Sequence, residues 1–289
     1  MTTILSASSV VAARTELLAD KVLKLRAKGF IPKLRVILAG ANPASLVYIG
    51  HKKKMCQRLG CEFELNRLSS SVSKEEFLNE IKKMNEDASI TGCFVQLPVP
   101  NQLKDIDITE LIAPEKDVDG FGAASIVDMF KGRDPMFVPC TPKGILDLLE
   151  HYKIGVSGKT VTVIGRSLIV GKPISLLLQN RGATVSMCHS KTPDLSIYTK
   201  NSDIVISAAG QTRFLGPQHF RTDQSQVLID VGMNRDQNGN LCGDMDFEAL
   251  KNKVKAITPV PGGVGPLTVL SLMENLVTAT ENKRQEDSQ

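Results

Sequence analysis

Short apolar runs rich in β-branched residues alternate with helix-length segments along most of the chain. In the first part, three such runs predict strands at 34–40, 61–68 and 92–98. Helices are predicted between them, at 43–59 and at 74–87. Strands that alternate with helices are typical of parallel sheets covered by helices. The pattern therefore predicts an α/β architecture.

The second part of the chain repeats this alternation. Five strands are predicted there, at 160–165, 183–189, 203–210, 226–233 and 254–260. A passage rich in Gly, Pro and Asp, 113–142, separates the two parts and is expected to be a linker region. We therefore expect a second α/β domain over 141–266, built on a parallel sheet.

A long helix is predicted from Leu267 to about Glu281, after the last strand of the second part. It is expected to pack back on the first part, so that the first domain comprises 1–140 together with 267–289. The polar tail 281–289 is expected to be disordered.

Composition narrows the class of protein. The net charge is +4, and no dense basic stripe with interleaved aromatic residues is present, which argues against a nucleic-acid partner. Six cysteines occur without a CxxC pair, so zinc ribbons and redox dithiols are not expected. We expect reduced thiols, as in a cytoplasmic protein. No apolar run reaches membrane-spanning length. The N-terminal residues favour an ordinary first helix over a transit peptide.

The run VTVIGRSLIVGKP, 161–173, has the pattern of a phosphate-binding turn. A β-branched strand leads directly into a glycine-bounded turn and then into a helix, whose N-terminal N–H groups can face an anion. The run departs from GxGxxG because Gly165 is followed by glycine only at Gly171. Arg166 and Ser167 stand between them and add a cation and a hydroxyl.

The end of the next strand indicates which dinucleotide would bind. An NAD site would have an acid there for the ribose 2′-hydroxyl, but this chain has His189, Ser190 and Lys191. Together with Arg166 these residues would accept a 2′-phosphate, so the pattern favours NADP. The loop alone is equally compatible with an ordinary strand–turn–helix that carries surface cations.

The helix predicted after Asn42 and Pro43 carries a second candidate site. Asn42 is suited to cap the helix and Gly60 to end it. Tyr48 and Lys52 are four residues apart and share one face, which continues through apolar residues. Burial there would favour a neutral Lys52 amine that can accept a proton. On the helix pattern alone, a solvated snorkelling lysine is the commoner case.

Three further segments carry candidate chemistry. Gln96 ends a buried strand, where open α/β sheets bind ligands, although a polar strand end is also ordinary. Asp117 and Asp119 precede Gly120, so they are candidate ligands for a metal or an amino group, or simply turn residues. The Pro- and Gly-rich stretch 257–268 would let its backbone approach a flat ligand closely.

Together these segments resemble the bifunctional methylenetetrahydrofolate dehydrogenase/methenyltetrahydrofolate cyclohydrolase family over nearly the whole chain. The motifs that carry the resemblance occur in the family's order and approximate spacing. They are Tyr48-x3-Lys52, VQLPVP, KDVDGF, PCTP, VIGRSLIVGKP, HSKT, IDVGMN and TPVPGGVGPLT. Each alone could arise by chance, but the ordered set is highly specific.

The resemblance implies two domains around a cleft, with NADP on the second, Rossmann-like domain and folate between the two. It implies that Lys52, Tyr48 and Gln96 are catalytic and contact the substrate, and that Asp119 holds the pterin. It implies folate contacts from Pro261, Gly262 and Gly265, and cofactor contacts from Gly165, Arg166, Ser167, Ser190, Gly232 and Thr268. No metal is implied.

The implied activity is NADP-dependent oxidation of 5,10-methylenetetrahydrofolate to the 5,10-methenyl form, and its hydrolysis to 10-formyltetrahydrofolate. The resemblance also implies a homodimer through the second domain. Two alternatives stay open: a dehydrogenase without cyclohydrolase activity, and a catalytically silent nucleotide-binding module. Ser125 stands where many family members have Asn, which leaves details of the substrate-side loop in doubt.

Overall fold

The computed structural model describes residues 1–286, and the chain divides into two compact units. Unit 1 comprises Met1–Ala12, Met129–Asp134 and Cys140–Thr268. Unit 2 comprises Ala13–Asp128, Pro135–Pro139 and the chain from Val269 onward. The chain passes between the units within α1 (Ser8–Arg26) and within α9 (Val264–Glu286).

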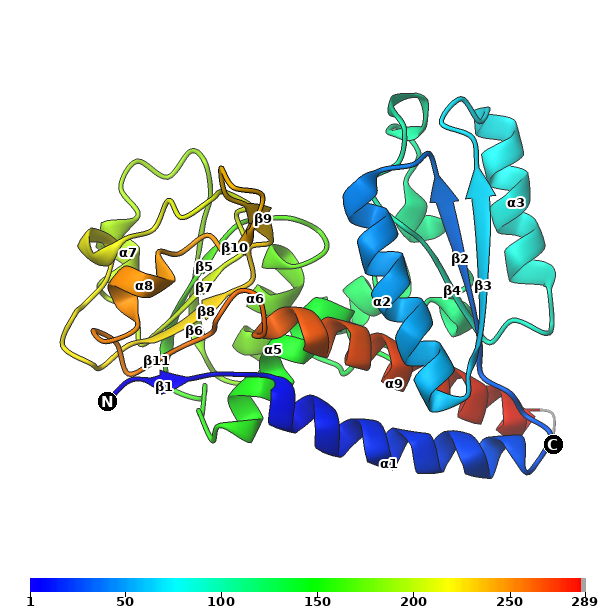
Figure 1. Ribbon diagram of the computed structural model, residues 1–289, viewed down its shortest axis with the longest axis horizontal. Helices are drawn as coiled ribbons and strands as arrows, with labels where there is room; N and C mark the ends of the chain where they lie inside the picture. Colours follow the sequence, from blue (N-terminus) through cyan, green and yellow to red (C-terminus); the bar gives the residue numbers. More distant parts are fainter. Residues whose placement is uncertain (287–289) are drawn as a thin grey trace. The chain divides into compact units, whose positions relative to one another are not determined.

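Unit 1 is built on a six-stranded sheet in the order β1-β11-β8-β7-β5-β6, and all of its neighbouring strands are parallel (Figure 1). The strands are β1 (Thr3–Ile4), β5 (Thr160–Ile164), β6 (Thr184–Cys188), β7 (Ile204–Ser207), β8 (Val227–Asp230) and β11 (Ala256–Ile257). The five strands predicted in this part of the chain are therefore confirmed. The short β1 has no such pattern and was not predicted.

Helices and a small hairpin complete unit 1. They are α5 (Cys140–His151), α6 (Gly171–Asn180), α7 (Ser196–Thr199), α8 (Phe247–Leu250), a 3₁₀ turn η4 (Pro217–His219), and the antiparallel pair β9 (Asn234–Arg235) and β10 (Leu241–Cys242). The central strands β7 and β8 are buried along their whole length. Strands of a parallel sheet are covered on both faces, which explains their continuous apolar sequence.

Unit 2 contains a three-stranded parallel sheet in the order β3-β2-β4. Its strands are β2 (Lys33–Ala39), β3 (Glu62–Leu68) and β4 (Gly92–Val95). Its helical segments are α2 (Pro43–Leu59), α3 (Lys74–Glu86), α4 (Ala123–Phe130, which crosses into unit 1 at its end), and the 3₁₀ turns η1 (Asn101–Leu103), η2 (Ile108–Glu110) and η3 (Pro114–Lys116). The predicted strands and helices of this part are confirmed, although β4 ends at Val95.

Helices α2 and α3 cover opposite faces of the unit 2 sheet (Figure 1). In α3, Phe77, Ile81 and Met84 recur at helical spacing and pack against one face of the sheet. Ser73 caps this helix by accepting a hydrogen bond from the Glu76 N–H. The sheet is thus held rigidly, with the carboxyl end of β4 and the N-terminal half of α2 available to build a site.

The passage 113–142, predicted as a linker region, contains η3, α4 and the start of α5, and the chain changes unit three times within it, after Asp128, Asp134 and Pro139. The prediction of a disordered tail is wrong in part. Helix α9 begins at Val264 and continues to Glu286, so residues 281–286 of the predicted disordered tail are helical. The Lys283 ammonium donates to the Ala88 carbonyl, which anchors this last part of the helix. Residues 287–289 of the tail lie outside the described residues.

Within residues 1–286, no helix is long and apolar enough to cross a membrane. In the same range, no group of three or more His, Cys, Asp or Glu side chains could hold a metal ion.

Candidate active site

Helix α2 begins and ends as its sequence predicts. The Asn42 Oδ1 accepts a hydrogen bond from the Ser45 N–H at 3.2 Å, and Pro43 is the first helical residue. Gly60 follows the helix with φ of +76°, a conformation that favours glycine. These signals set the register that places Tyr48 and Lys52 on one face of the helix.

Lys52 is a buried lysine on a helix whose other lysines are exposed. It is 7% exposed, whereas its neighbours Lys53 and Lys54 face solvent. Its Nζ donates to the Gln96 Oε1 at 3.2 Å and lies 3.9 Å from the centroid of the Phe94 ring. Lys52 is therefore not a solvated snorkelling lysine, because its amine lies between an amide oxygen and an aromatic face.

Gln96 follows β4 directly, and its amide is held in one orientation. Its Nε2 donates to the Leu97 carbonyl at 2.9 Å, so its Oε1 faces the Lys52 amine. The Ser45 hydroxyl donates to the same Leu97 carbonyl at 3.2 Å. Ser45 was not predicted, although its place one helical turn before Tyr48 on the face of Lys52 is a usable signal.

Tyr48 lies one turn before Lys52 on α2 and is half-buried. Burial raises the pKa of its phenol above the ordinary value of 10.0. Tyr48 therefore keeps its proton at neutral pH and remains a hydrogen-bond donor.

The KDVDGF segment forms a tight turn around one of its two acids. Asp117 is 5% exposed and accepts a hydrogen bond from the Gly122 N–H at 2.5 Å. Burial raises its pKa to about 6, and the neighbouring Asp119 adds to this effect. Gly120 has φ of +78° and leaves no room for a side chain against the backbone of residues 137–139. Turn formation thus accounts for Asp117, while Asp119 is half-buried and remains the candidate ligand.

The side-chain amide of Asn275, in α9, holds this turn through two hydrogen bonds. Its Nδ2 donates to the carbonyls of Val118 at 2.9 Å and Val138 at 3.0 Å. Nothing in the local sequence predicted this role, because the partners are more than 130 residues away. Ser125, the residue that departs from the family pattern, lies in α4 and is buried.

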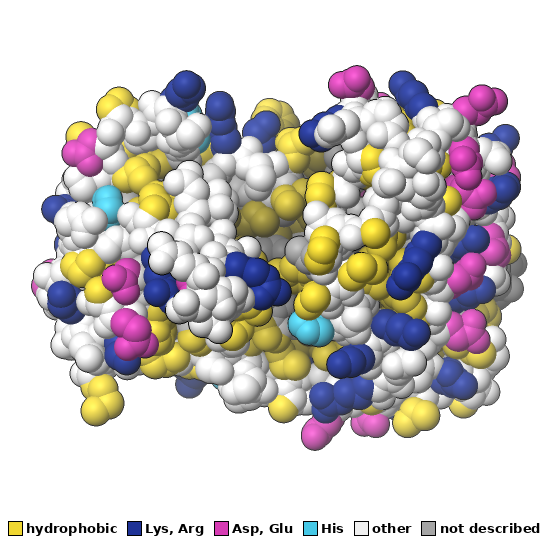
Figure 2. All heavy atoms as spheres, turned by 45° about the horizontal axis from the view of Figure 1, so that its top comes forward, with side chains coloured by type: hydrophobic (Ala, Val, Ile, Leu, Met, Phe, Trp, Pro, Cys, Tyr) yellow, Lys and Arg dark blue, Asp and Glu magenta, His cyan; other side chains and the backbone are white. Residues whose placement is uncertain are grey.

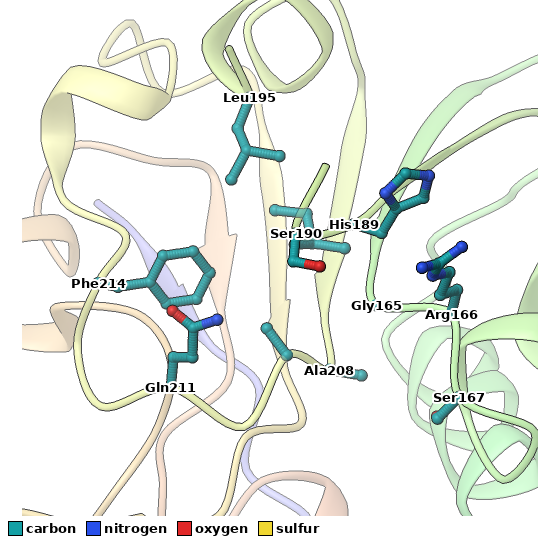
Figure 3. A pocket seen from close by; sticks show the side chains of 11 residues that line it. Gly165, Arg166, Ser167, His189, Ser190, Leu195, Ala208, Gln211 and Phe214 are labelled. Atoms are coloured by element: carbon teal, nitrogen blue, oxygen red, sulfur yellow. The ribbon is translucent and has the colours of Figure 1, made fainter. Parts of the chain in front are cut away.

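In unit 1, the glycine-bounded turn after β5 borders a pocket. Gly165 has φ of +121°, and a side chain there would meet the Ala208 carbonyl. A side chain at Gly171 would meet the carbonyl of Gly165, so the start of α6 packs directly on the turn. The pocket has a volume of about 260 Å³ and is lined by residues 164–167, 189–190, 195, 208–209, 211 and 214 (Figure 3).

The polar groups of this pocket suit an anion. Figure 3 shows Arg166 and His189 on one side of it, facing Gln211 and Phe214 on the other. The Ser167 Oγ accepts from the N–H groups of Val170 and Gly171 at 3.2 and 3.3 Å, so its own proton stays free to donate to a phosphate.

Of the three polar residues that follow β6, His189 and Ser190 line the pocket and Lys191 does not. The His189 Nδ1 accepts from the Lys191 N–H at 3.2 Å, which leaves the other ring nitrogen as the donor in the neutral ring. Lys191 itself is exposed and does not line the pocket. Ser190 does line the pocket.

The remaining predicted residues of unit 1 do not line this pocket. Gly232 follows β8, residues 261 and 262 precede α9, and Gly265 and Thr268 lie at its start. A side chain at Gly232 would meet the carboxylate of Asp244. Thr268 lies in α9, 3.2 Å from the Thr141 hydroxyl. Pro261, Gly262 and Gly265 belong to unit 1, whereas Tyr48, Lys52, Gln96 and Asp119 belong to unit 2. On the face shown in Figure 2, Lys and Arg side chains are interspersed with Asp and Glu rather than gathered in one stripe.

Known proteins resemble this chain over most of its length. Residues 5–119 match the sequence model of the tetrahydrofolate dehydrogenase/cyclohydrolase catalytic domain, and residues 139–284 match that of its NAD(P)-binding domain. The chain is 46% identical over 262 residues to the bifunctional protein FolD of Geobacillus thermodenitrificans, with 91% of each chain covered.

Solved structures give the same result. The bifunctional FolD methylenetetrahydrofolate dehydrogenase/cyclohydrolase of Campylobacter jejuni is 41% identical, with a TM-score of 0.94 and coverage of 98% of this chain and 99% of that one. The FolD of Trypanosoma brucei, solved with NADP cofactor and an inhibitor, is 32% identical, with a TM-score of 0.92 and coverage of 98% and 99%. The chain therefore belongs to the tetrahydrofolate dehydrogenase/cyclohydrolase family.

Proposed function

We propose that this protein oxidises 5,10-methylenetetrahydrofolate with NADP and hydrolyses the resulting 5,10-methenyltetrahydrofolate to 10-formyltetrahydrofolate, in one-carbon metabolism. The observation that carries the proposal is the buried Lys52 amine held by the Gln96 amide oxygen at 3.2 Å. Burial of a lysine disfavours its charged ammonium form and so costs free energy. The same burial favours the neutral amine, which can accept a proton. Unit 1 adds the pocket that a dinucleotide needs.

The dehydrogenase step needs the residues of unit 1 to hold the cofactor. The close packing of Gly165 and Gly171 leaves backbone free to approach a pyrophosphate, and the Ser167 hydroxyl can donate to it. Arg166, Ser190 and His189 line the same pocket, with no acid among its lining residues, and suit a ribose 2′-phosphate. When bound, NADP supplies the nicotinamide that accepts the hydride from the methylene carbon of the substrate.

The cyclohydrolase step is assigned to Lys52. The methenyl substrate is a cation, and its positive charge favours the neutral form of an amine beside it. Neutral Lys52, oriented by Gln96 and assisted by Tyr48, takes a proton from water as the water attacks the methenyl carbon. The bond between this carbon and N5 of the folate then breaks, N5 takes the proton back from Lys52, and loss of the hydroxyl proton to solvent leaves the 10-formyl product. One lysine thus accounts for the second activity.

We assign the remaining site residues by the same proposal. Asp119 holds the pterin ring, and Pro261, Gly262 and Gly265 contact the folate. Gly232 and Thr268 contact the cofactor together with residues 165–167. Residues 1–140 with 267–289 form the catalytic, folate-binding domain, and residues 141–266 form the NADP-binding domain.

Two other functions stay as alternatives. A dehydrogenase without cyclohydrolase activity would not need the buried pairing of Lys52 with Gln96, which this chain retains. A silent nucleotide-binding module would need neither that pair nor the half-buried Asp119. The intact set therefore favours the bifunctional enzyme.

We further propose a cytoplasmic homodimer formed through the second domain. Strand β6 is the last strand of the unit 1 sheet in the described residues, so one edge of it is free to pair. Beside it lies a groove of about 310 Å³ that includes the apolar side chains of Leu176, Val185 and Met187. Sedimentation of the protein at several concentrations tests the dimer, and a monomer at micromolar concentration contradicts it.

The bifunctional proposal is tested by one absorbance experiment. Methylenetetrahydrofolate is mixed with NADP and, separately, with NAD, and the reduced nicotinamide and the methenyl intermediate are followed together. The proposal expects faster reduction of NADP than of NAD, followed by decay of the methenyl absorbance. Reduction without enzymatic methenyl decay would favour the dehydrogenase alternative, and no reduction would favour the silent module.

A further inference from the structure

Asp244 is a fully buried acid behind the cofactor pocket, at 0% exposure. Its Oδ2 accepts from the N–H groups of Ala209 at 2.8 Å and Gly210 at 3.4 Å, and from the Ser207 hydroxyl at 2.8 Å. Its Oδ1 accepts from the Gln211 N–H at 2.9 Å and from the Asn234 Nδ2 at 3.0 Å. One carboxylate therefore binds three consecutive backbone N–H groups of the loop that follows β7.

Asp230, at the end of β8, interlocks with this acid. Its Oδ1 accepts from the N–H groups of Gly232 and Asp244, each at 3.0 Å, and its Oδ2 accepts from that of Met245 at 2.8 Å. A side chain at Gly232 would meet the Asp244 carboxylate, and one at Gly243 would meet the Asp230 carboxylate. The Asp244 carboxylate thus packs against Gly232, and the Asp230 carboxylate packs against Gly243. This reciprocal packing fixes the segments after β8 and around residue 244 relative to each other.

The loop held in this way is a wall of the cofactor pocket. Ala208, Ala209 and Gln211 line it, opposite the turn that carries Arg166 (Figure 3). The N–H groups that bind Asp244 belong to the pocket-lining residues themselves or to Gly210 between them. Parallel sheets bind ligands at the carboxyl ends of their strands, and the acid holds the loop at that edge.

We propose that Asp244 is a positioning residue for NADP: it holds residues 209–211 in the conformation that the cofactor requires, and it does so without contacting the cofactor. The proposal rests on the assignment of this pocket to NADP. A carboxylate suits the task because it only accepts hydrogen bonds and has two oxygens for them. An asparagine has the same shape but only one side-chain oxygen. Its NH₂ group would replace either Oδ1 or Oδ2, and the N–H groups that donate to that oxygen would lose their acceptor.

The test compares Asp244→Asn with Asp246→Asn. Asp246 is a matched control two residues away, because its carboxylate accepts from the Ala249 N–H and caps the short α8 without touching the pocket loop. The KM for NADP of Asp244→Asn should rise by about tenfold or more, as expected when buried N–H groups lose their acceptor. The hydrolysis of added methenyltetrahydrofolate, which needs no NADP, should stay within about twofold of wild type in both variants.

A purely structural role would lower thermal stability and leave the KM for NADP unchanged at temperatures well below the transition.

Hydrogen exchange gives the second measurement. The amides of residues 209–211 should lose protection in Asp244→Asn, regain it when NADP saturates the protein, and keep it in Asp246→Asn. If Asp244→Asn does not fold, Asn234→Ala removes one hydrogen bond from the same Oδ1 and should raise the KM by about two- to fivefold.

An unchanged KM for NADP, or unchanged exchange at residues 209–211, would overturn the positioning role. Failure of the wild-type protein to reduce NADP would instead contradict the proposed function, so the two failures are distinguishable.

Discussion

The amine of Lys52 and the amide oxygen of Gln96 are 3.2 Å apart, one from the middle of α2 and the other from the residue after β4. The Nε2 of the same Gln96 amide donates to the Leu97 carbonyl, so the amide cannot flip without losing both hydrogen bonds. Gln96 therefore presents a neutral hydrogen-bond acceptor to Lys52. A carboxylate in its place would stabilise the charged ammonium more strongly than the amide oxygen does.

Gln96→Glu should move the pH dependence of the cyclohydrolase. A carboxylate at this distance favours the charged ammonium, so less neutral amine is available at neutral pH. We expect the rate at pH 7 to fall by about tenfold or more and to recover as the pH is raised. Initial rates of methenyl hydrolysis from pH 6 to 9 measure this, with the spontaneous rate subtracted.

Gln96→Leu is the matched comparison for that experiment. It removes the acceptor without adding a charge, so the rate should fall at all pH values with no shift of the profile toward high pH. Identical profiles for Gln96→Glu and wild type would contradict the contact between Gln96 and the reacting amine.

Lys52→Met should remove the cyclohydrolase activity and leave NADP binding intact. Methionine fills the buried space of the lysine stem and cannot accept a proton, so we expect a loss of about 10²- to 10⁴-fold. Lys53→Met is the control, because Lys53 is exposed on the same helix and should keep full activity. Hydrolysis by Lys52→Met at the wild-type rate would refute the role assigned to this lysine.

Arg166→Ala should weaken the binding of NADP far more than that of NAD. Arg166 lines the unit 1 pocket, and a guanidinium paired with a 2′-phosphate contributes about 1.5–3 kcal/mol, or roughly ten- to hundredfold in the dissociation constant. Titration with each nucleotide measures the difference. Lys172→Ala is the control, since Lys172 lines the other groove. Equal losses for the two nucleotides would show that Arg166 does not contact the 2′-phosphate.

Much of the fold could be predicted because its signals are local. Strands β4, β7 and β8 are short apolar runs that are buried along their length, and α2 is bounded by Asn42 and Gly60 as the sequence indicates. The burial of Lys52 does not follow from the helix pattern, which alone favours a solvated lysine. The Phe94 ring and the Gln96 amide that surround its amine come from another part of the chain. The two-residue β1 was missed because a strand of that length has no periodicity, and it exists only through pairing with β11.

The supporting residues of both sites could not be predicted, since each acts through contacts distant in the sequence. Asn275 fixes the Asp119 turn from α9, and Asp244 holds a loop more than 30 residues earlier in the chain. A buried polar side chain is informative only once its partners are known. The end of α9 was misjudged for the same reason: residues 281–286 are polar in sequence, but Lys283 contacts the Ala88 carbonyl.

Asp117 should make the stability of the protein depend on pH. Burial raises its pKa from 3.8 to about 6, so the folded protein holds a proton that the unfolded chain releases between these values. This contribution to stability is fully present below about pH 4 and is lost as the pH rises through about 6. Its full size is on the order of 3 kcal/mol. Urea unfolding followed by circular dichroism from pH 4.5 to 8 measures the change in wild type and in Asp117→Asn.

Asp117→Asn keeps an oxygen for the Gly122 N–H and cannot ionise, so the free energy of unfolding of wild type minus that of the variant should fall as the pH rises. Asp230 has a pKa raised to about 7 by burial, but it is present in both proteins and cancels in the difference. Asp87→Asn is the control, and its difference from wild type should stay constant from pH 4.5 to 8. The hydrogen bond from the Ser89 hydroxyl lowers the pKa of Asp87, so its contribution to stability is present above about pH 4 and is lost only below the measured range. A difference for Asp117→Asn that is constant with pH would mean that the buried carboxyl is already ionised throughout, and that the backbone N–H groups around it outweigh the cost of burial.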